Sequence, residues 1–421
     1  MAAVSRLFRL STFTVAAGAA LKISKDVTDR TRNSSPNSNL ELVLVQIAFR
    51  HGARTPIFPA PCQELEPVTW QADLLMGALP YTDFDYELKH VSGGARPFSK
   101  YDDRQMKKIL KGGSPQGQLT KVGQQQMYDL GKKCGKLYID DLKFVQETFS
   151  PHEVFIRTSN IQRTIDSARC VMAGMFGKEQ LRGVVTMHTE DECKEFLYPN
   201  ITYCGYLKSG FKYAVLKGPN LVEGFHARQK RIGEALKINY EEKPLVAVKL
   251  RDIVITMMAH NMAVPQVILQ NLNVIEEQAL QEFIVTQCGL AHLRKKYLSF
   301  GVGVFLEEVT DNFIKTIDGR SHYKMMLYSV HDTSVAALLI ALGIFDDKWP
   351  GFAADLTFEL YRDKDQGYFV RVLYEGEEKI LPGCSSSLCP LNKFKELVSE
   401  YFINDWEKAC QVVKERELTV A

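Results

Sequence analysis

The sequence contains no long hydrophobic run and no large excess of charge of either sign. No stretch reaches 18 consecutive apolar residues, so we expect no membrane-spanning helix. Lysine and arginine number 52, and aspartate and glutamate number 50. This near balance excludes a dedicated polyanion binder, so no nucleic-acid partner is predicted. An apolar fraction of 45% with 24% charged residues is typical of a globular protein rather than a disordered one.

Cysteine pairs with metal-ligand spacing are also missing. The chain has nine cysteines but no Cys-x-x-Cys, and its histidines are not spaced with them as zinc ligands would be. We therefore predict no metal and no cofactor. Cys384 and Cys389 flank a tight serine-rich segment and could close a small disulfide loop. Whether they do depends on the redox compartment.

The first 25 residues contain no acidic residue, although they include two arginines and two lysines. Together with frequent serine and threonine, this predicts a mitochondrial transit peptide over residues 1–25. A secretory signal is the alternative, because Leu10–Leu21 is a short, mildly apolar core containing small residues. Residues 26–39 are polar and predict a linker. Asn33 and Asn200 begin Asn-x-Ser/Thr sequons, which matter only in a secretory protein.

Three short apolar segments predict buried strands that end in cationic or histidine residues. They are Glu41–Phe49, Val154–Ile156 and Lys324–Val330. The residues at their ends are Arg50, His51 and Arg54, then Arg157, and finally His331 and Asp332. Helical spacing predicts helices over 121–138, from about 160, and over 333–342. A further strand pair is predicted over 355–362 and 367–374.

Alternating strands and helices predict an α/β fold with a mostly parallel central sheet and helices on both faces. In such sheets, ligands bind beyond the carboxyl ends of the strands. We therefore expect the charged strand ends to meet at one edge of the sheet.

Two stretches of the chain do not fit the strand–helix alternation. Residues 201–319 show helical spacing without a clear strand, and residues 62–114 are irregular and rich in Gly, Pro, Tyr and Asp. We predict that these stretches form a smaller, mainly helical cap domain. The α/β catalytic body is then built from 40–61, 115–200 and 320–421.

Three arginines and two histidines at one sheet edge would form an oxyanion site. Arginine presents a planar fork of donors to phosphate and stays charged at physiological pH. A histidine among arginines resists protonation and keeps a free ring nitrogen as a nucleophile. A nearby carboxyl group could protonate the leaving oxygen. A lone Arg-His or His-Asp pair would more often be structural, but the combination points to phosphate chemistry.

The motifs at these positions resemble those of the histidine acid phosphatases. Residues 50–56, Arg-His-Gly-Ala-Arg-Thr-Pro, match the signature R-H-G-x-R-x-P, and the order and spacing of two further motifs agree. Those motifs are Arg157–Thr164 and His331-Asp332. The resemblance covers about residues 40–410, is weakest across 201–319, and implies the phosphoglycerate-mutase-like histidine phosphatase fold.

The resemblance also implies a mechanism. His51 would attack phosphorus and form a phosphohistidine, and Asp332 would protonate the departing alcohol. The phosphate oxygens would be bound by Arg50, Arg54, Arg157 and His331. No metal is implied.

By the same resemblance, the partner is a small phosphate monoester, chiefly a lysophospholipid such as lysophosphatidic acid. Inositol polyphosphates or phosphosugars are the alternative substrates, and a non-catalytic phosphate-binding protein is the alternative of another class. We expect a monomer. Structural roles are assigned to the other histidines and to Arg163 and Arg169.

Overall fold

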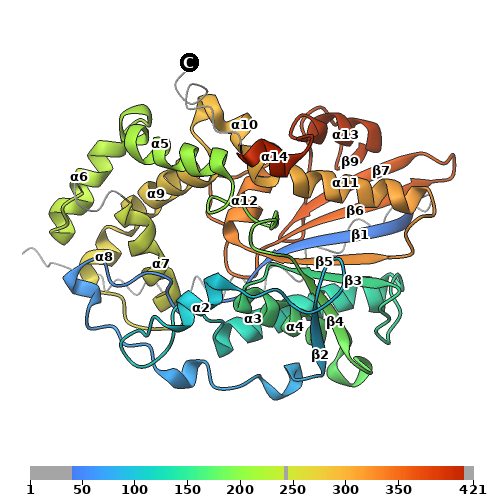
Figure 1. The fold of residues 1–421 in the computed structure, drawn as a ribbon, viewed down its shortest axis with the longest axis horizontal. Coiled ribbons are helices and arrows are strands. Elements are labelled where there is room, and N and C mark those ends of the chain that lie inside the picture. The colour runs from blue at the N-terminus through green and yellow to red at the C-terminus, as the bar shows by residue number, and fades with distance from the viewer. Residues whose placement is uncertain (1–39, 241–244, 412–421) are drawn as a thin grey trace, which may run out of the picture.

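The computed structural model describes residues 40–240 and 245–411. The predicted targeting segment, the linker and the Asn33 sequon lie outside these residues. Figure 1 shows a central sheet on the right and a group of helices, α5 to α9, on the left. In the described part of the chain, no helix combines the length and hydropathy needed to cross a bilayer.

The described strands form one nine-stranded sheet, ordered β2-β4-β3-β5-β1-β6-β7-β8, with β9 pairing to β7. Neighbouring strands from β2 to β1 run parallel, whereas β6 and the strands beyond it join in antiparallel pairs. The strands are β1 Leu40–Arg50, β2 Tyr86–His90, β3 Val154–Thr158, β4 Val185–Thr189, β5 Met325–Val330, β6 Asp355–Asp363, β7 Tyr368–Tyr374, β8 Glu377–Lys379 and β9 Leu388–Pro390.

Helices cover both faces of this sheet, which confirms the predicted α/β class. The helices are α2 Lys100–Met106, α3 Lys121–Gly135, α4 Gln162–Phe176, α5 Gly205–Leu221, α6 Phe225–Leu236, α7 Val246–Ala259, α8 Gln266–Gln270, α9 Leu272–Phe283, α10 Arg294–Leu298, α11 Val304–Ile317, α12 Asp332–Ala341, α13 Leu391–Ser399 and α14 Trp406–Gln411.

Strand β1 shows why both faces are apolar. Leu44 and Ala48 pack with α11, α12 and α13, whereas Val45, Ile47 and Phe49 pack with α3 and α4. Successive side chains of a strand point to opposite faces, so a central strand between two helical layers is apolar over most of its length. Before Arg50, the one buried polar side chain of β1 is Gln46, whose Nε2 donates to the Val309 carbonyl of α11 at 2.9 Å. Because β1 lies between β5 and β6, its last residue, Arg50, reaches the edge of the sheet near its middle.

The cap region differs from the prediction at two places. Residues 86–90 were assigned to the cap, but they form β2, the edge strand of the central sheet. Helix α11 was assigned to the cap as well, but Phe305, Val309 and Phe313 pack on the sheet. An edge strand of five residues gives little periodic signal, and an amphipathic helix does not show which surface it covers. The described residues of 201–319 contain no strand, as expected.

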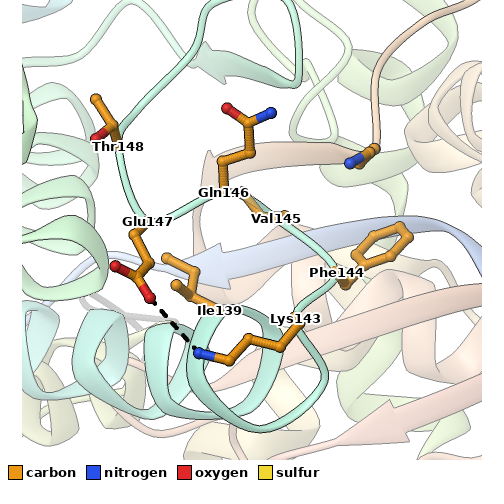
Figure 2. Close-up of a pocket in the computed structure, with 8 residues that line it drawn as sticks. Ile139, Lys143, Phe144, Val145, Gln146, Glu147 and Thr148 are labelled. Carbon is orange, nitrogen blue, oxygen red and sulfur yellow. Dashed lines mark ion pairs between the residues drawn. The ribbon is translucent and has the colours of Figure 1, made fainter.

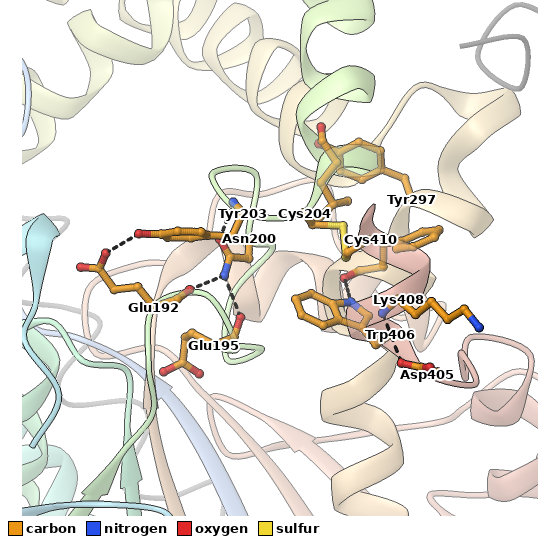
Figure 3. The surroundings of a disulfide bond; sticks show 12 residues. Glu192, Glu195, Asn200, Tyr203, Cys204, Tyr297, Asp405, Trp406, Lys408 and Cys410 are labelled. Atoms are coloured by element: carbon orange, nitrogen blue, oxygen red, sulfur yellow. Dashed lines mark hydrogen bonds between the residues drawn. A yellow bond between two sulfur atoms is a disulfide. The ribbon is translucent and has the colours of Figure 1, made fainter. Parts of the chain in front are cut away.

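Two disulfides are present in the described residues. Cys384 and Cys389 are bonded, which is one of the two outcomes that the sequence left open. Cys204 is bonded to Cys410 across 206 residues, a pairing that the sequence did not predict because nothing local connects the two cysteines. This second disulfide joins the start of α5 to α14 (Figure 3).

Candidate active site

The catalytic edge begins where β1 ends. A Cβ atom on Gly52 would lie 2.3 Å from the carbonyl oxygen of Gly123, so only glycine lets the chain pass this close to α3. Thr120 caps α3 by accepting a hydrogen bond from the Gly123 amide, and its own amide donates to the Ala53 carbonyl. The segment after β1 is thus fixed against the first turn of α3, and it holds His51 and Arg54 at the carboxyl end of the strand.

His51 is 1% exposed and is oriented by its own backbone. Its Nδ1 lies 2.8 Å from the Gly52 carbonyl oxygen. A carbonyl oxygen can only accept, so Nδ1 carries the proton and Nε2 keeps the lone pair. Burial lowers the pKa of His51 well below its usual value, and the charges of Arg163, Arg50 and Arg54 lower it further. These effects favour the neutral imidazole, with the Nε2 lone pair free.

Arg50 and Arg54 are almost fully buried, and each is paired with an aspartate from a distant part of the chain. Arg50 Nη2 lies 2.9 Å from Asp332 Oδ2, and burial lowers the pKa of Arg50 to about 10. Arg54 Nη1 lies 2.8 Å from Oδ1 of Asp252, which is on α7. The other oxygen of Asp252 accepts from the Ile57 amide at 2.8 Å. Asp252 was not predicted as a site residue, because a lone aspartate in a helical insertion carries no motif.

Asp332 begins α12, directly after His331. Burial raises the pKa of its carboxyl group, but Arg50, Arg54 and the indole N–H of Trp349 outweigh burial and hold that pKa well below the usual range. The Trp349 Nε1 donates to Oδ2 at 3.0 Å. The carboxyl group is therefore a carboxylate.

His331 lies next to His51, with ring centroids 5.6 Å apart. Arg163 Nη2 lies 3.3 Å from His331 Nδ1, and a guanidinium can only donate, so Nε2 of His331 carries the proton. This Nε2 lies 2.9 Å from Ser159 Oγ, which accepts from it. Burial lowers the pKa of His331 well below its usual value, with Arg163 as the next cause.

The structure therefore brings Arg163 to the site, although the sequence analysis gave it a structural role. Arg163 is 6% exposed and sits in the first turn of α4. A cation there is unfavourable because the helix dipole is positive at its amino end, unless an anion binds nearby. An arginine in the first turn of a predicted helix was therefore the feature of the sequence that could have indicated an anion-binding role for Arg163. Arg169 meets the structural expectation, because it donates to the Thr82 carbonyl at 3.0 Å.

Arg157, predicted to bind phosphate, is not brought into this group. Its Nη1 and Nη2 make a bidentate ion pair with Glu195, at 3.1 and 2.9 Å. Both side chains are at most 3% exposed. Glu195 also accepts from the Leu197 amide, and the Leu197 carbonyl accepts from Ser334 of α12. Arg157 thus stabilises the loop beside His331, and Glu195 of that loop is labelled in Figure 3. Arg157 was predicted to bind phosphate because it follows an apolar strand, and that local pattern contains no information about its pairing with Glu195.

The remaining donors at the site point to an anionic ligand. Among the described residues, the Nε–H groups of Arg50, Arg54 and Arg163 have no hydrogen-bond partner, although all are buried. Leaving a buried donor unsatisfied costs about 1–3 kcal/mol. Three such donors around one imidazole fit the oxygens of a bound phosphoryl group.

Two other features of the described residues lie outside the charged cluster. A cavity of about 360 Å³ is lined by residues around Val145 and Lys324, at the amino ends of β3 and β5 (Figure 2), whereas the charged cluster follows the carboxyl ends. The side chains of His90, Glu190 and Asp191 offer ligand atoms within 4.8 Å of one another. His90 Nε2 already lies 2.6 Å from Glu190 Oε1, so a hydrogen bond between these two side chains accounts for their closeness.

The sequence matches the family described as the Histidine phosphatase superfamily (branch 2) over residues 41–212 and 282–375. These segments include the three motifs, so the resemblance inferred from them is confirmed. The chain belongs to this family and is a phosphomonoesterase of the histidine acid phosphatase type. The matched segments leave out residues 213–281, which contain Asp252.

The curated relatives include proteins named lysophosphatidic acid phosphatase type 6. The mouse protein is 38% identical over 375 residues, covering 87% of this chain and 86% of its own length. The human protein is 37% identical, covering 87% and 85%. Human prostatic acid phosphatase is 26% identical and covers 90% of each chain. Among solved structures, the apo phytase of Hafnia alvei has a TM-score of 0.60 at 14% identity, covering 90% of this chain and 100% of its own. This likeness concerns the fold alone.

Proposed function

We propose that this phosphatase hydrolyses lysophosphatidic acid to monoacylglycerol and phosphate through a phosphohistidine at His51. The observation that carries the choice of substrate is the identity of 36–38%, over most of the chain, to relatives named for that activity. The cluster of His51, Arg50, Arg54, Arg163 and Asp332 supports the proposed mechanism.

The first step of the proposed mechanism transfers the phosphoryl group to the enzyme. The unpartnered Nε–H groups of the three arginines bind the non-bridging oxygens. A monoanionic substrate gives its proton to Asp332, because the bound phosphate offsets the cations that keep this carboxyl group ionised. The Nε2 lone pair of His51 then attacks phosphorus, the ester P–O bond breaks, and Asp332 protonates the departing glycerol oxygen.

The second step regenerates the imidazole. The carboxylate of Asp332 takes a proton from a water molecule. The oxygen of that water molecule attacks phosphorus as the P–N bond to His51 breaks. The proton on Asp332 leaves with the product as dihydrogen phosphate. Arg50, Arg54 and Arg163 stay charged throughout and stabilise the charge that moves onto the phosphoryl oxygens.

Inositol polyphosphates are the competing substrates, and the electrostatics of the site disfavour them. Two of the three arginines are already paired with aspartates, Asp332 and Asp252. Three guanidinium charges less two carboxylates leave a net charge of +1 when both histidines are neutral. That balance suits one phosphoryl group better than several.

The substrate is tested by a turnover panel with the purified protein. Phosphate release is measured from lysophosphatidic acid below its critical micelle concentration, from phytate and from glucose 6-phosphate. We expect kcat/KM for lysophosphatidic acid to exceed the others by at least about tenfold. His51→Ala serves as the background control and should lose turnover on every substrate. A higher kcat/KM for phytate would overturn the lipid assignment.

We also propose that the mature protein resides in the mitochondrion, in its oxidising intermembrane space. Two disulfides favour an oxidising compartment over a reducing one. The secretory pathway is the alternative, but the sequon residue Asn200 is only 1% exposed. Its amide donates to the Glu192 and Glu195 carbonyls (Figure 3), so a glycan there is incompatible with this fold. Reduced Cys204 and Cys410, or a glycan on Asn200, in the mature protein would contradict the proposal.

A further inference from the structure

The two oxygens of the Asp332 carboxyl group are held differently. Oδ2 accepts from Arg50 Nη2 at 2.9 Å and from Trp349 Nε1 at 3.0 Å. Within the described parts of the chain, Oδ1 accepts one hydrogen bond, from the Thr333 amide at 2.9 Å. Because Oδ2 already faces two donors, Oδ1 is the oxygen that can carry a proton.

Trp349 is itself fixed from the cap side of the molecule. Its ring centroid lies 4.1 Å from that of Phe283 on α9. Cζ of Arg251, on α7, lies 4.3 Å from the centroid of the indole ring. Arg251 is held in place by Glu276, at 2.6 Å. The indole therefore has a defined plane, and its N–H has a defined direction.

The residue after Trp349 contacts the other half of the ion pair. The carbonyl oxygen of Pro350 accepts from Arg50 Nη1 at 2.5 Å, and Cζ of Arg50 lies 4.3 Å from the centre of the Phe352 ring. The short segment from Trp349 to Phe352 thus touches both Arg50 and Asp332. The family match covers this segment but leaves out residues 213–281, so Arg251 and Glu276 are contributed by the part of the cap outside it.

We propose that Trp349 is the positioning residue for the proton donor: it holds Oδ2 of Asp332 as a fixed acceptor and turns Oδ1 toward the leaving oxygen. This inference rests on the proposed role of Asp332, and Trp349 acts through that carboxyl group. Helices α7 and α9 set the indole, so the cap takes part in the chemistry through the orientation of the acid.

The pKa of Asp332 depends on the charged and polar groups that surround its carboxyl group. Arg50 approaches from the end of β1 and Arg54 from the segment after it. His331 directly precedes Asp332, and Trp349 lies in the loop before β6. Arg50 and Arg54 keep their charge over the working range. Loss of the indole N–H removes a donor that favours the carboxylate, so the acid keeps its proton to higher pH.

The test replaces the indole while keeping an aromatic ring, with Trp349→Phe. The matched control is Trp406→Phe, because the Trp406 Nε1 also makes one hydrogen bond, to the Phe300 carbonyl at 2.8 Å, but on the C-terminal helix. Thermal denaturation of both variants measures any loss of stability. Turnover is measured with glycerol 2-phosphate, which has a poor leaving group, and with p-nitrophenyl phosphate, which has a good one.

We expect Trp349→Phe to lower kcat for glycerol 2-phosphate by about 3–10-fold and for p-nitrophenyl phosphate by much less. The alkaline limb of its kcat profile should move up by roughly one pH unit. Trp406→Phe should change neither quantity.

A double-mutant cycle with Asp332→Asn separates positioning from packing. If Trp349 acts through Asp332, its replacement should have little further effect on kcat in the Asp332→Asn background. Equal losses on both substrates, an unmoved alkaline limb or additive losses in the cycle would overturn the inference. No phosphate release from either ester by the wild-type protein would instead refute the proposed function.

Discussion

At the scale of single residues, the environment of His51 explains how one imidazole can serve as a nucleophile. Its Nδ1 is fixed by the Gly52 carbonyl, and three nearby guanidinium groups oppose its protonation. The pKa of the imidazole is therefore depressed, so the free base persists well below neutral pH. Acid phosphatase activity needs this combination, because the substrate gains a proton under the conditions in which an ordinary histidine would lose its lone pair.

Arg163 and Arg157 should respond differently to the same substitution. Arg163→Gln should weaken competitive inhibition by inorganic phosphate by at least about tenfold, since it removes a donor to the anion. Arg157→Gln should leave that inhibition constant nearly unchanged, because its fork is taken by Glu195. It should instead lower stability by about 3–5 kcal/mol, because Glu195 would be left buried and unpaired. Phosphate inhibition curves and denaturant melts measure these effects in both variants. A tenfold weaker phosphate inhibition in Arg157→Gln would show that Arg157 binds phosphate after all.

At the scale of elements, the cap helices are arranged around a buried acid on α9. Glu282 is completely buried, and its Oε2 accepts from the Val248 amide in the first turn of α7 at 3.0 Å. Its Oε1 accepts from Gln278 at 3.2 Å. Glu282 thereby supplies the amino end of α7 with an acceptor. The same helix carries Arg251 and Asp252 to the active site, so the anchoring of α7 matters for catalysis.

Glu282 also makes the stability of this region depend on pH. Burial raises the pKa of its carboxyl group to about 8. Between the ordinary pKa of a glutamate and about 8, the folded state then binds more protons than the unfolded state. The contribution of Glu282 to the free energy of unfolding is therefore present at low pH and is lost as the pH rises through that window. Glu282→Gln should reduce the loss of stability between pH 5 and pH 9 by about 1 kcal/mol or more. Glu277→Gln, at an exposed position of the same helix, is the control. Identical pH dependence in the two variants would show that Glu282 does not titrate in this way.

At the scale of the whole molecule, the Cys204–Cys410 disulfide ties the C-terminal helix to the start of the cap. Trp406, on α14, donates to the Phe300 carbonyl, which strengthens the same contact (Figure 3). The loop before Cys204 contains Glu195, the partner of Arg157, and Tyr198, whose ring lies 5.4 Å from that of His331. The disulfide therefore supports a segment that leads directly to the active site.

Removing this disulfide should destabilise the protein more than it impairs the chemistry. The paired change Cys204→Ser and Cys410→Ser should lower the free energy of unfolding by about 2–5 kcal/mol, because the bond closes a long loop in the unfolded chain. Denaturant melts under non-reducing conditions measure the effect. Cys193→Ser, at an exposed free cysteine, is the control and should change little. An unaltered midpoint in the double variant would mean that the bond is absent in solution.

Local sequence patterns were sufficient to predict most strands of the central sheet and the helix α3. The ranges expected for β1, β3, β5, β6 and β7 agree with the observed strands to within a few residues. Helix α3 begins at Lys121, as expected, and Thr120 caps it. These elements are predictable because periodicity and capping are encoded over a few neighbouring residues. Edge strand β2 and the packing of α11 depend on distant partners, and these were not predicted correctly.

The sequence by itself determined the family, the parallel core and the convergence of His51, Arg50, Arg54, His331 and Asp332, because each lies in a local motif at a strand end. Tertiary structure alone decided how their charges are balanced. Asp252 and Trp349 reach the edge from remote segments, and Glu195 binds Arg157. Such pairings are set by packing across hundreds of residues, and no short pattern in the chain records them.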